Sequence, residues 1–256
     1  EGDYISIDGS TGNIYDGVVF AHTSSMAMDK LGRVHTCCAA VPNSWHVMGV
    51  TQGAGLSLKW FRDQFCAAEK QTASLMGVDE YYLMDKEAEQ VPVGANRLLY
   101  LPYLMGERTP HLDPNARGVF FGLSAMHTKR DMLRAVMEGV TYSLRDCVEV
   151  FREMGISVDD MMACGGGGTS PLWRSMLADL YNCPVKTVAS KEGPSLGVAI
   201  LASVGAGIYN SVPEACSAIV KTDKTQTPQA ENVPAYESYY QLFLEFCDSH
   251  RGIPRK

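Results

Sequence analysis

The feature that most constrains the fold is a long amphipathic pattern between Thr128 and Met154. Apolar side chains recur there every three or four residues, at Leu133, Val136, Val140, Leu144, Cys147 and Phe151. This spacing is typical of one buried face of an α-helix. Thr128 is a suitable N-cap, and Gly155 is a suitable residue to follow the last turn. The sequence therefore predicts one long helix over residues 128–154.

The segments around this helix predict an α/β domain. Short alternating stretches predict strands at residues 4–7, 13–15, 18–21, 34–38 and 45–50. A helical period then begins near Leu56, and a further helical or mixed stretch covers residues 72–89. Buried strands at residues 98–104, 161–164 and 185–188 are followed by further helices, the last over about 235–249. Strands in the first part of the chain, followed by alternating strand–helix units, predict an α/β domain with a mixed sheet and flanking helices.

Composition excludes several classes of partner and site. The 256 residues carry a net charge of −7, whereas a general nucleic-acid binder would carry a basic stripe. A nucleotide site remains compatible with this charge, because a few backbone N–H groups and one Mg²⁺ can hold a triphosphate. No stretch resembles a signal peptide or a membrane span. We expect no partnership with nucleic acid or membrane.

The eight cysteines indicate a reducing environment. None of them forms a CxxC pair, so the sequence does not predict a zinc site. Several lie in apolar helical patterns, where a free cysteine behaves as a small hydrophobic residue. We therefore expect a cytoplasmic protein. The histidines show no metal-ligand spacing, and no metal-ligating residue is predicted.

A glycine-rich connection is the strongest candidate site. A short strand ends at Cys164, and Gly165, Gly166, Gly167 and Gly168 follow, then Thr169, Ser170 and Pro171. Ser170 suits an N-cap and Pro171 suits the first helical position. Glycines allow a ligand to approach the backbone, and the helix start offers free N–H groups. The spacing fits neither a Walker A motif nor a dinucleotide fingerprint, so a flexible turn without a ligand is the alternative interpretation.

A second candidate is the loop Gly106–His111, which follows a buried strand. It places Glu107 and Arg108 where loops often carry function. The alternative is a solvated turn with a local ion pair. The sequence shows no nucleophile elbow.

Several of these segments together resemble the FGGY family of carbohydrate kinases. The stretch 118–123, followed by seven residues and then 131–138, matches the second signature of that family at every defined position. Five further segments resemble xylulokinases in the same order: residues 45–48, 58–63, 106–111, 164–179 and 193–199. The resemblance covers about residues 17–250.

The resemblance implies an actin/hexokinase-like, ribonuclease H-like ATPase lobe. In this family the γ-phosphoryl group of ATP moves to a sugar hydroxyl, and D-xylulose is the acceptor that the resemblance favours. ATP binds mainly on the C-terminal lobe, and the sugar binds mainly on the N-terminal lobe. An Asp of the N-terminal lobe acts as the base, and Mg²⁺ neutralises the phosphates. We expect that lobe to precede residue 1, so the chain alone should be inactive.

Residue by residue, the resemblance places the adenosine and the α-phosphate at Gly166 and Gly167. It places Ser170 beside the adenine pocket and Gly55 near the terminal phosphates. The adjoining Gly165 and Gly168 are counted with the ATP-binding residues. Glu107 and Arg108 are candidates for a position near the phosphates.

The first residues depart from the family pattern. The family begins this lobe with a Gly-Thr-Ser-Gly hairpin that leads directly into Val-Val-Phe, whereas Asp16-Gly17 stands before Val18 here. Residues 1–15 instead resemble a segment of pyruvate phosphate dikinase, without its His-bearing motif. We expect a leader hairpin over residues 1–17 and the kinase domain over 18–256. Ser10 and Thr11 could mimic the phosphate hairpin, but the five residues before Val18 argue against this.

Two other functions are compatible with the sequence. One is a nucleotide-binding or partner-binding module that stands alone and has no catalysis. The other is a phosphotransferase related to pyruvate phosphate dikinase, for which the chain offers no catalytic histidine. If the chain is half of a sugar kinase, the face that meets the N-terminal lobe would be exposed, so we expect self-association or a partner chain.

Overall fold

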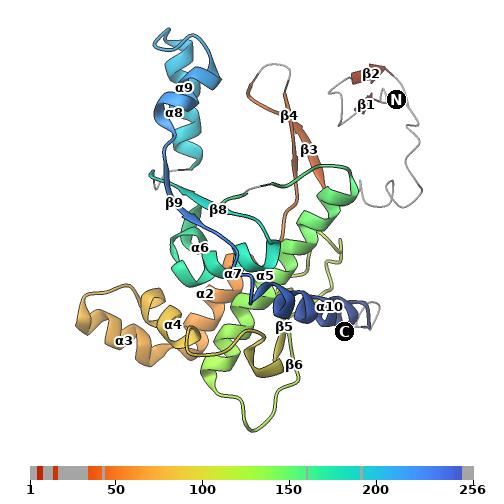
Figure 1. The fold of residues 1–256 in the computed structure, drawn as a ribbon, viewed down its shortest axis with the longest axis vertical. Helices are drawn as coiled ribbons and strands as arrows, with labels where there is room; N and C mark the ends of the chain where they lie inside the picture. The colour runs from red at the N-terminus through yellow and green to blue at the C-terminus, as the bar shows by residue number, and fades with distance from the viewer. Residues whose placement is uncertain are drawn as a thin grey trace.

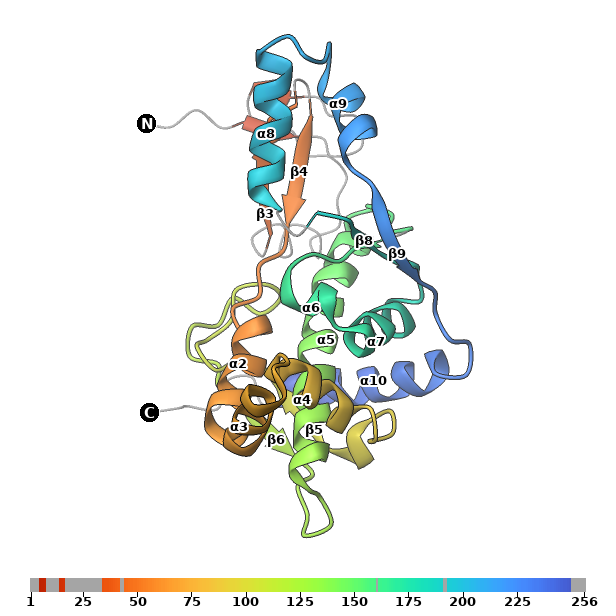
Figure 2. The same cartoon turned by 90° about the vertical axis from the view of Figure 1, so that its left-hand side faces the viewer.

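The computed structural model of the chain describes residues 5–7, 14–16, 34–41, 44–159, 161–190 and 193–249. A helical body forms one end of the molecule, and two slender projections extend from it (Figure 1, Figure 2). One projection is a strand hairpin and the other is a pair of helices.

The long helix is α5, Lys129–Glu153, and it runs through the centre of the body (Figure 1). Thr128 and Asp131 form a capping box at its start, in which each side chain pairs with the other's backbone N–H. After its end, Gly155 takes a positive φ of 79°, which L-residues with a side chain rarely adopt. The predicted helix, its cap and its terminating glycine are confirmed.

The core is built around α5. Its side chains Leu133, Val136, Met137 and Val140 are almost fully buried. Strand β5, Leu99–Leu101, crosses it so closely that a side-chain carbon at Gly139 would lie 2.1 Å from the carbonyl oxygen of Tyr100. The contact between this helix and this strand therefore requires glycine at position 139.

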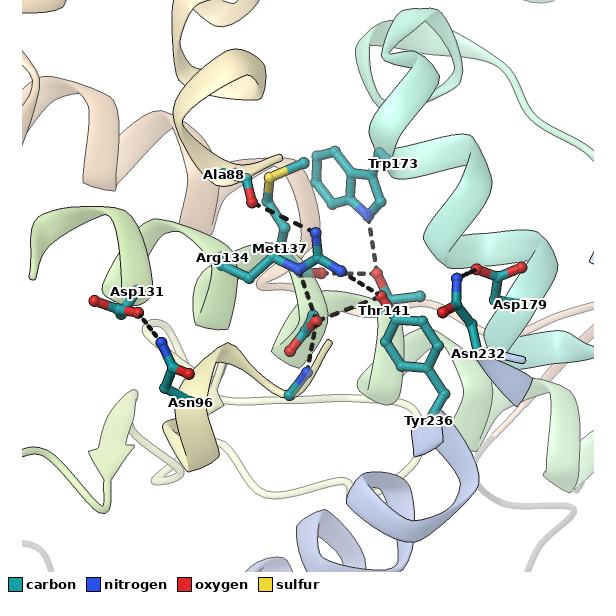
Figure 3. A network of polar contacts seen from close by, with 12 residues as sticks. Ala88, Asn96, Asp131, Arg134, Met137, Thr141, Trp173, Asp179, Asn232 and Tyr236 are labelled. Atoms are coloured by element: carbon teal, nitrogen blue, oxygen red, sulfur yellow. Dashed lines mark hydrogen bonds and ion pairs between the residues drawn. The ribbon is translucent and has the colours of Figure 1, made fainter. Parts of the chain in front are cut away.

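A buried ion pair ties other elements to α5. Arg134 Nε lies 2.7 Å from Glu138 Oε1, and both side chains are almost fully buried. Arg134 also donates to the Tyr236 hydroxyl at 2.8 Å (Figure 3), and Glu138 accepts the Gly94 N–H at 3.1 Å. Because neither charge reaches water, these partners are needed to offset desolvation.

The N-terminal part of the body is helical. Its helices are α2 (Ala54–Phe65), α3 (Ala67–Met76), α4 (Glu80–Ala88) and the 3₁₀ turn η1 (Ala95–Arg97). The predicted helix near Leu56 is confirmed. The stretch predicted as helical or mixed is two helices, because Gly77 with its positive φ of 67° ends the first of them.

The strands of the described residues form four small sheets. Strand β5 pairs antiparallel with β6, Val119–Phe121, and β3, His35–Cys38, pairs antiparallel with β4, Trp45–Met48. The projecting hairpin in Figure 1 is this β3–β4 pair. Strands β1 (Ile5–Ile7) and β2 (Ile14–Asp16) form another antiparallel pair, as predicted for the leader. The turn between them and the predicted strand at 18–21 lie outside the described residues.

The predicted mixed sheet is present in the C-terminal part. Strand β7, Met161–Met162, is parallel to β8, Val185–Val188. Strand β8 is antiparallel to β9, Thr222–Gln226. The β7–β8 connection is a strand–helix–strand unit, and its turn holds the four glycines. The sheet therefore places the glycines at the carboxyl end of a parallel strand.

Three helices complete the chain. The second projection consists of α8 (Pro194–Gly205) and α9 (Val212–Ile219), and α10 (Val233–Ser249) returns to the body. The side chains Tyr236, Tyr240 and Phe243 of α10 are buried in the core. In the part of the chain that the structure describes, no helix has the length and apolar character needed to cross a bilayer.

Candidate nucleotide site

The candidate site begins where β7 ends. Residues Gly165–Thr169 form a single helical turn, α6, and Ser170 leads into α7, Pro171–Tyr181. The sequence predicted a glycine-rich loop between the strand and the helix, and the structure shows a helical turn there. We name this segment the glycine turn. The Ser170 hydroxyl accepts the Trp173 N–H at 3.0 Å, and Pro171 occupies the first turn of α7. The predicted N-cap and N-terminal proline are confirmed.

The four glycines have different surroundings. Gly165 has a positive φ of 72°. A side-chain carbon at Gly168 would lie 2.8 Å from the backbone of Ala163, so the turn packs tightly on the end of β7. A side-chain carbon at Gly166 would meet no described atom within 4 Å, and one at Gly167 would touch the Trp173 ring at 3.5 Å. Gly166 and Gly167 therefore present open backbone, while Gly165 and Gly168 shape the turn.

A cavity of about 440 Å³ adjoins the glycine turn, a size that suits a small-molecule ligand. Gly166, Gly167 and Gly168 line it on one side. Ala54 and Gly55, at the start of α2, also line it. Two glycine segments that are far apart in the sequence thus meet at one cavity.

The start of α2 is fixed by close backbone packing. A side-chain carbon at Gly53 would lie 1.9 Å from the carbonyl oxygen of Pro102, so only glycine allows this approach. Ser57, one turn later, donates to the same carbonyl at 3.4 Å. A side-chain carbon at Gly55 would meet no described atom within 4 Å. The helix start is held from behind, while its cavity side is open.

The remaining cavity wall is mostly apolar. Helix α7 contributes Trp173, Leu177 and Tyr181, and α5 contributes Val140 and Leu144. Apolar and aromatic walls with open backbone at one end suit a flat ring that carries a polar tail. Trp173 is not among the site residues that the sequence predicts. Its spacing of four and eight residues from Leu177 and Tyr181 places all three on one face of α7, and this signal could have identified the wall.

The Trp173 ring is fixed by a polar chain. Its Nε1 donates to the Thr141 hydroxyl at 2.9 Å (Figure 3). That hydroxyl donates in turn to the carbonyl oxygen of Met137 at 2.7 Å. Since a buried indole N–H needs a partner, this contact fixes both α7 and the ring beside Gly167.

Ser170 contacts a carboxylate from another helix. Burial raises the pKa of Asp85 on α4, and a hydrogen bond from Ser170 opposes that rise. Ser170 and Gly165 are not among the residues that line the cavity, as far as the described chain goes. Both residues were predicted to take part in ATP binding. The structure instead places them beside the cavity-lining residues Gly166–Gly168, at the two ends of the glycine turn.

The loop with Glu107 and Arg108 supports α2 from another direction. Glu107 is 3% exposed, and its Oε1 accepts the Gln52 N–H at 2.8 Å and the Arg108 N–H at 2.7 Å. Burial raises the pKa of Glu107 to about 7, and these two hydrogen bonds limit the rise. Neither residue is among those that line the described cavity. Glu107 instead holds the segment that leads into Gly55, and the Arg108 side chain is exposed.

The two remaining candidate site residues, Ser10 and Thr11, lie outside the described residues. Within the described ranges, no group of three or more His, Cys, Asp or Glu side chains is arranged to hold a metal ion.

Comparison with known proteins identifies the family. Residues 17–206 match the C-terminal domain of the FGGY family of carbohydrate kinases. A xylulose kinase from Bacillus subtilis is 37% identical over 227 residues, which are 89% of this chain and 44% of that protein. A gluconokinase from Bacillus licheniformis is 36% identical over 84% of this chain and 42% of its own length.

Solved structures of kinases have a similar fold. The ligand-bound xylulose kinase from Lactobacillus acidophilus superposes with a TM-score of 0.74 at 26% identity, over 86% of this chain and 42% of that one. This confirms the predicted actin-like α/β fold. The chain spans less than half the length of these relatives. It belongs to the FGGY family of carbohydrate kinases and carries that family's C-terminal domain.

Proposed function

We propose that the chain is the ATP-binding half of a sugar kinase that phosphorylates a pentulose, with D-xylulose as the acceptor. The observation that carries this proposal is the meeting of Gly55 with Gly166–Gly168 around one cavity. The relatives named xylulose kinase support the choice of acceptor.

The cavity walls suit adenosine. We propose that the base lies against the apolar side chains of α7 and α5, and that the phosphate tail passes over the open backbone at Gly166 and Gly167. Gly55 then faces the terminal phosphates. Backbone N–H groups serve this purpose well, because they attract anions without a charged side chain.

Phosphoryl transfer depends mainly on positioning and electrostatics. We propose that the acceptor hydroxyl and its carboxylate base are supplied by an N-terminal lobe. Mg²⁺, when bound, would neutralise phosphate charge; it is commonly held by the phosphates, waters and one or two carboxylates. The part played by this chain is to bind and orient the nucleotide.

The binding test compares two glycine-to-valine variants. We expect the chain to bind Mg–ATP weakly, with Kd of about 0.1–1 mM, because half of the cleft is supplied by another lobe. Gly167→Val should abolish binding, since a branched side chain would stand where the ligand meets the backbone. Gly197→Val on α8 is the matched control, because a side-chain carbon there meets no described atom within 4 Å. Equal calorimetric binding by all three proteins would remove the glycine turn from the site.

The turnover test uses a coupled ADP-release assay with D-xylulose and Mg–ATP. We expect no sugar-dependent turnover by the chain alone. Absence of a general base typically costs about 10²–10⁴-fold, and loss of the acceptor site forfeits roughly 7–11 kcal/mol of proximity. Turnover after addition of a separately expressed N-terminal half would support the split kinase. Nucleotide binding with no turnover in the mixture would instead favour a module without catalysis.

We propose a reducing, cytoplasmic setting, supported by the eight cysteines, which are all free thiols. We also propose that the chain self-associates when no N-terminal half is present, because α8 exposes Val198 and Leu201. Sedimentation at several concentrations, with and without that half, would test the second statement.

A further inference from the structure

We infer that Arg174 is a positioning residue for nucleotide binding, which acts by holding the glycine turn in its helical form. This inference rests on the proposed function of the cavity. Arg174 lies on α7, one residue after Trp173, and is 6% exposed. It touches the turn from the side of α7 and is not among the residues that line the cavity.

The glycine turn needs support from outside its own sequence. Glycine disfavours helix because it has many alternative conformations, and a single helical turn gains little from its own hydrogen bonds. Four glycines followed by Thr169 would therefore not hold this geometry alone. The Thr169 hydroxyl donates to the carbonyl oxygen of Gly166 at 2.7 Å, which is one local restraint.

Arg174 provides the stronger restraint. Its Nη1 donates to the carbonyl oxygen of Gly168 at 2.6 Å and to that of Thr169 at 2.9 Å. Hydrogen bonds from a charged donor are stronger than neutral ones, more so in a buried position. These two carbonyls are at the end of the turn, where helix carbonyls lack partners within the helix. The guanidinium therefore caps the turn.

The start of α7, which carries Arg174, is itself fixed in place. The residue before Arg174 is Trp173, whose indole is hydrogen-bonded to Thr141 on α5 (Figure 3). The turn also meets the end of β7, where a side-chain carbon at Gly168 would lie 2.8 Å from Ala163. The turn is thus held by both β7 and the Arg174 guanidinium. Gly166 and Gly167, between these supports, keep the open backbone that faces the cavity.

The inference predicts a loss of affinity without a loss of the fold. Arg174→Met keeps much of the apolar stem but removes both hydrogen bonds. We expect it to weaken Mg–ATP binding by about tenfold or more, the usual effect of losing a hydrogen bond to a charged group. Arg174→Lys retains a charged donor and should recover part of the affinity. Thr169→Val, which removes only the local restraint, should weaken binding less than Arg174→Met.

The matched control is Arg117→Met. Arg117 Nη1 also donates to two backbone carbonyls, those of Pro114 at 3.2 Å and Ala116 at 2.7 Å, and none of these three residues lines the described cavity. We expect wild-type affinity for this variant. Should Arg174→Met fail to fold, the Arg174→Lys and Thr169→Val proteins carry the test, each compared with Arg117→Met.

Amide NMR spectra of the ligand-free proteins provide a readout that general destabilisation would not give. We expect the Gly166–Gly168 amide resonances to move toward random-coil positions in Arg174→Met while those of α5 stay in place. Unchanged glycine resonances, or equal affinity in Arg174→Lys, Thr169→Val and wild type, would overturn the inference. Failure of the wild type to bind any adenine nucleotide would reject the proposed function. Displaced glycine resonances in that case would still show that Arg174 holds the turn.

Discussion

Substitution of Glu107 by Gln should change how the stability of the protein depends on pH. Glu107 is buried, and burial raises its pKa from 4.5 to about 7. The folded protein then retains the Glu107 proton at pH values where the unfolded chain has lost it. Stability should therefore fall as the pH rises from about 4.5 to 7, and the loss should be complete above the folded pKa.

The size of this effect follows from the shift. One pKa unit corresponds to about 1.36 kcal/mol, so a rise from 4.5 to about 7 costs up to about 3 kcal/mol at pH 8. Glu107→Gln removes the titration, and its amide oxygen can still accept the N–H groups of Gln52 and Arg108. We expect the variant to be up to about 3 kcal/mol more stable than wild type at pH 8 and nearly equal to it at pH 4.5.

The assay is urea unfolding of both proteins at pH 5, 6, 7 and 8, with the free energy of unfolding extrapolated to water. The difference between variant and wild type isolates Glu107, because other titrating groups act in both proteins. Glu245→Gln, at an exposed position on α10, is the control for the exchange of a carboxylate for an amide outside the core. The reasoning would be refuted if the difference in stability between Glu107→Gln and wild type did not change with pH, or if wild type were more stable than the variant at pH 8.

Three further predictions concern packing and access. Gly139→Ala should destabilise the fold by about 3 kcal/mol, since the added carbon would lie 2.1 Å from the Tyr100 carbonyl oxygen. Thermal unfolding would measure this loss, and an unchanged stability would contradict the close contact between β5 and α5. Thr128→Ala should cost about 1 kcal/mol through loss of the capping box with Asp131, measured by the same method with Thr128→Ser as a control close to wild type. Cys164 is exposed and lines the cavity, so Mg–ATP should slow its reaction with a thiol reagent, whereas equal rates with and without nucleotide would place the ligand elsewhere.

Local signals in the sequence were sufficient for much of the fold. The capping box at Thr128 and the positive φ of Gly155 define the ends of the central helix, and each depends only on neighbouring residues. Ser170 and Pro171 likewise mark the start of α7. These features could be predicted because the hydrogen bonds and backbone restrictions involved are short-range.

The features of the site that the sequence did not predict depend on contacts between segments that are distant in the chain. The helical form of the glycine turn is supported by Arg174 and the end of β7, which are contacts that the strand–glycine–helix pattern does not reveal. The family resemblance assigned Gly55 and Gly166 to one ligand, but only tertiary packing shows the cavity that both line. The raised pKa of Glu107 has a similar origin, because burial is a property of the assembled fold.

The placement of α10 has a practical consequence for anyone who cuts this chain into domains. The family match ends at residue 206, whereas Tyr236 and Phe243 lie beyond it and are almost completely buried in the core. An expression fragment trimmed at the end of the match would lose these aromatic side chains and uncover Tyr142 of α5, whose ring lies 5.3 Å from that of Phe243. We expect such a fragment to aggregate on expression, so an expressed domain should extend through residue 249.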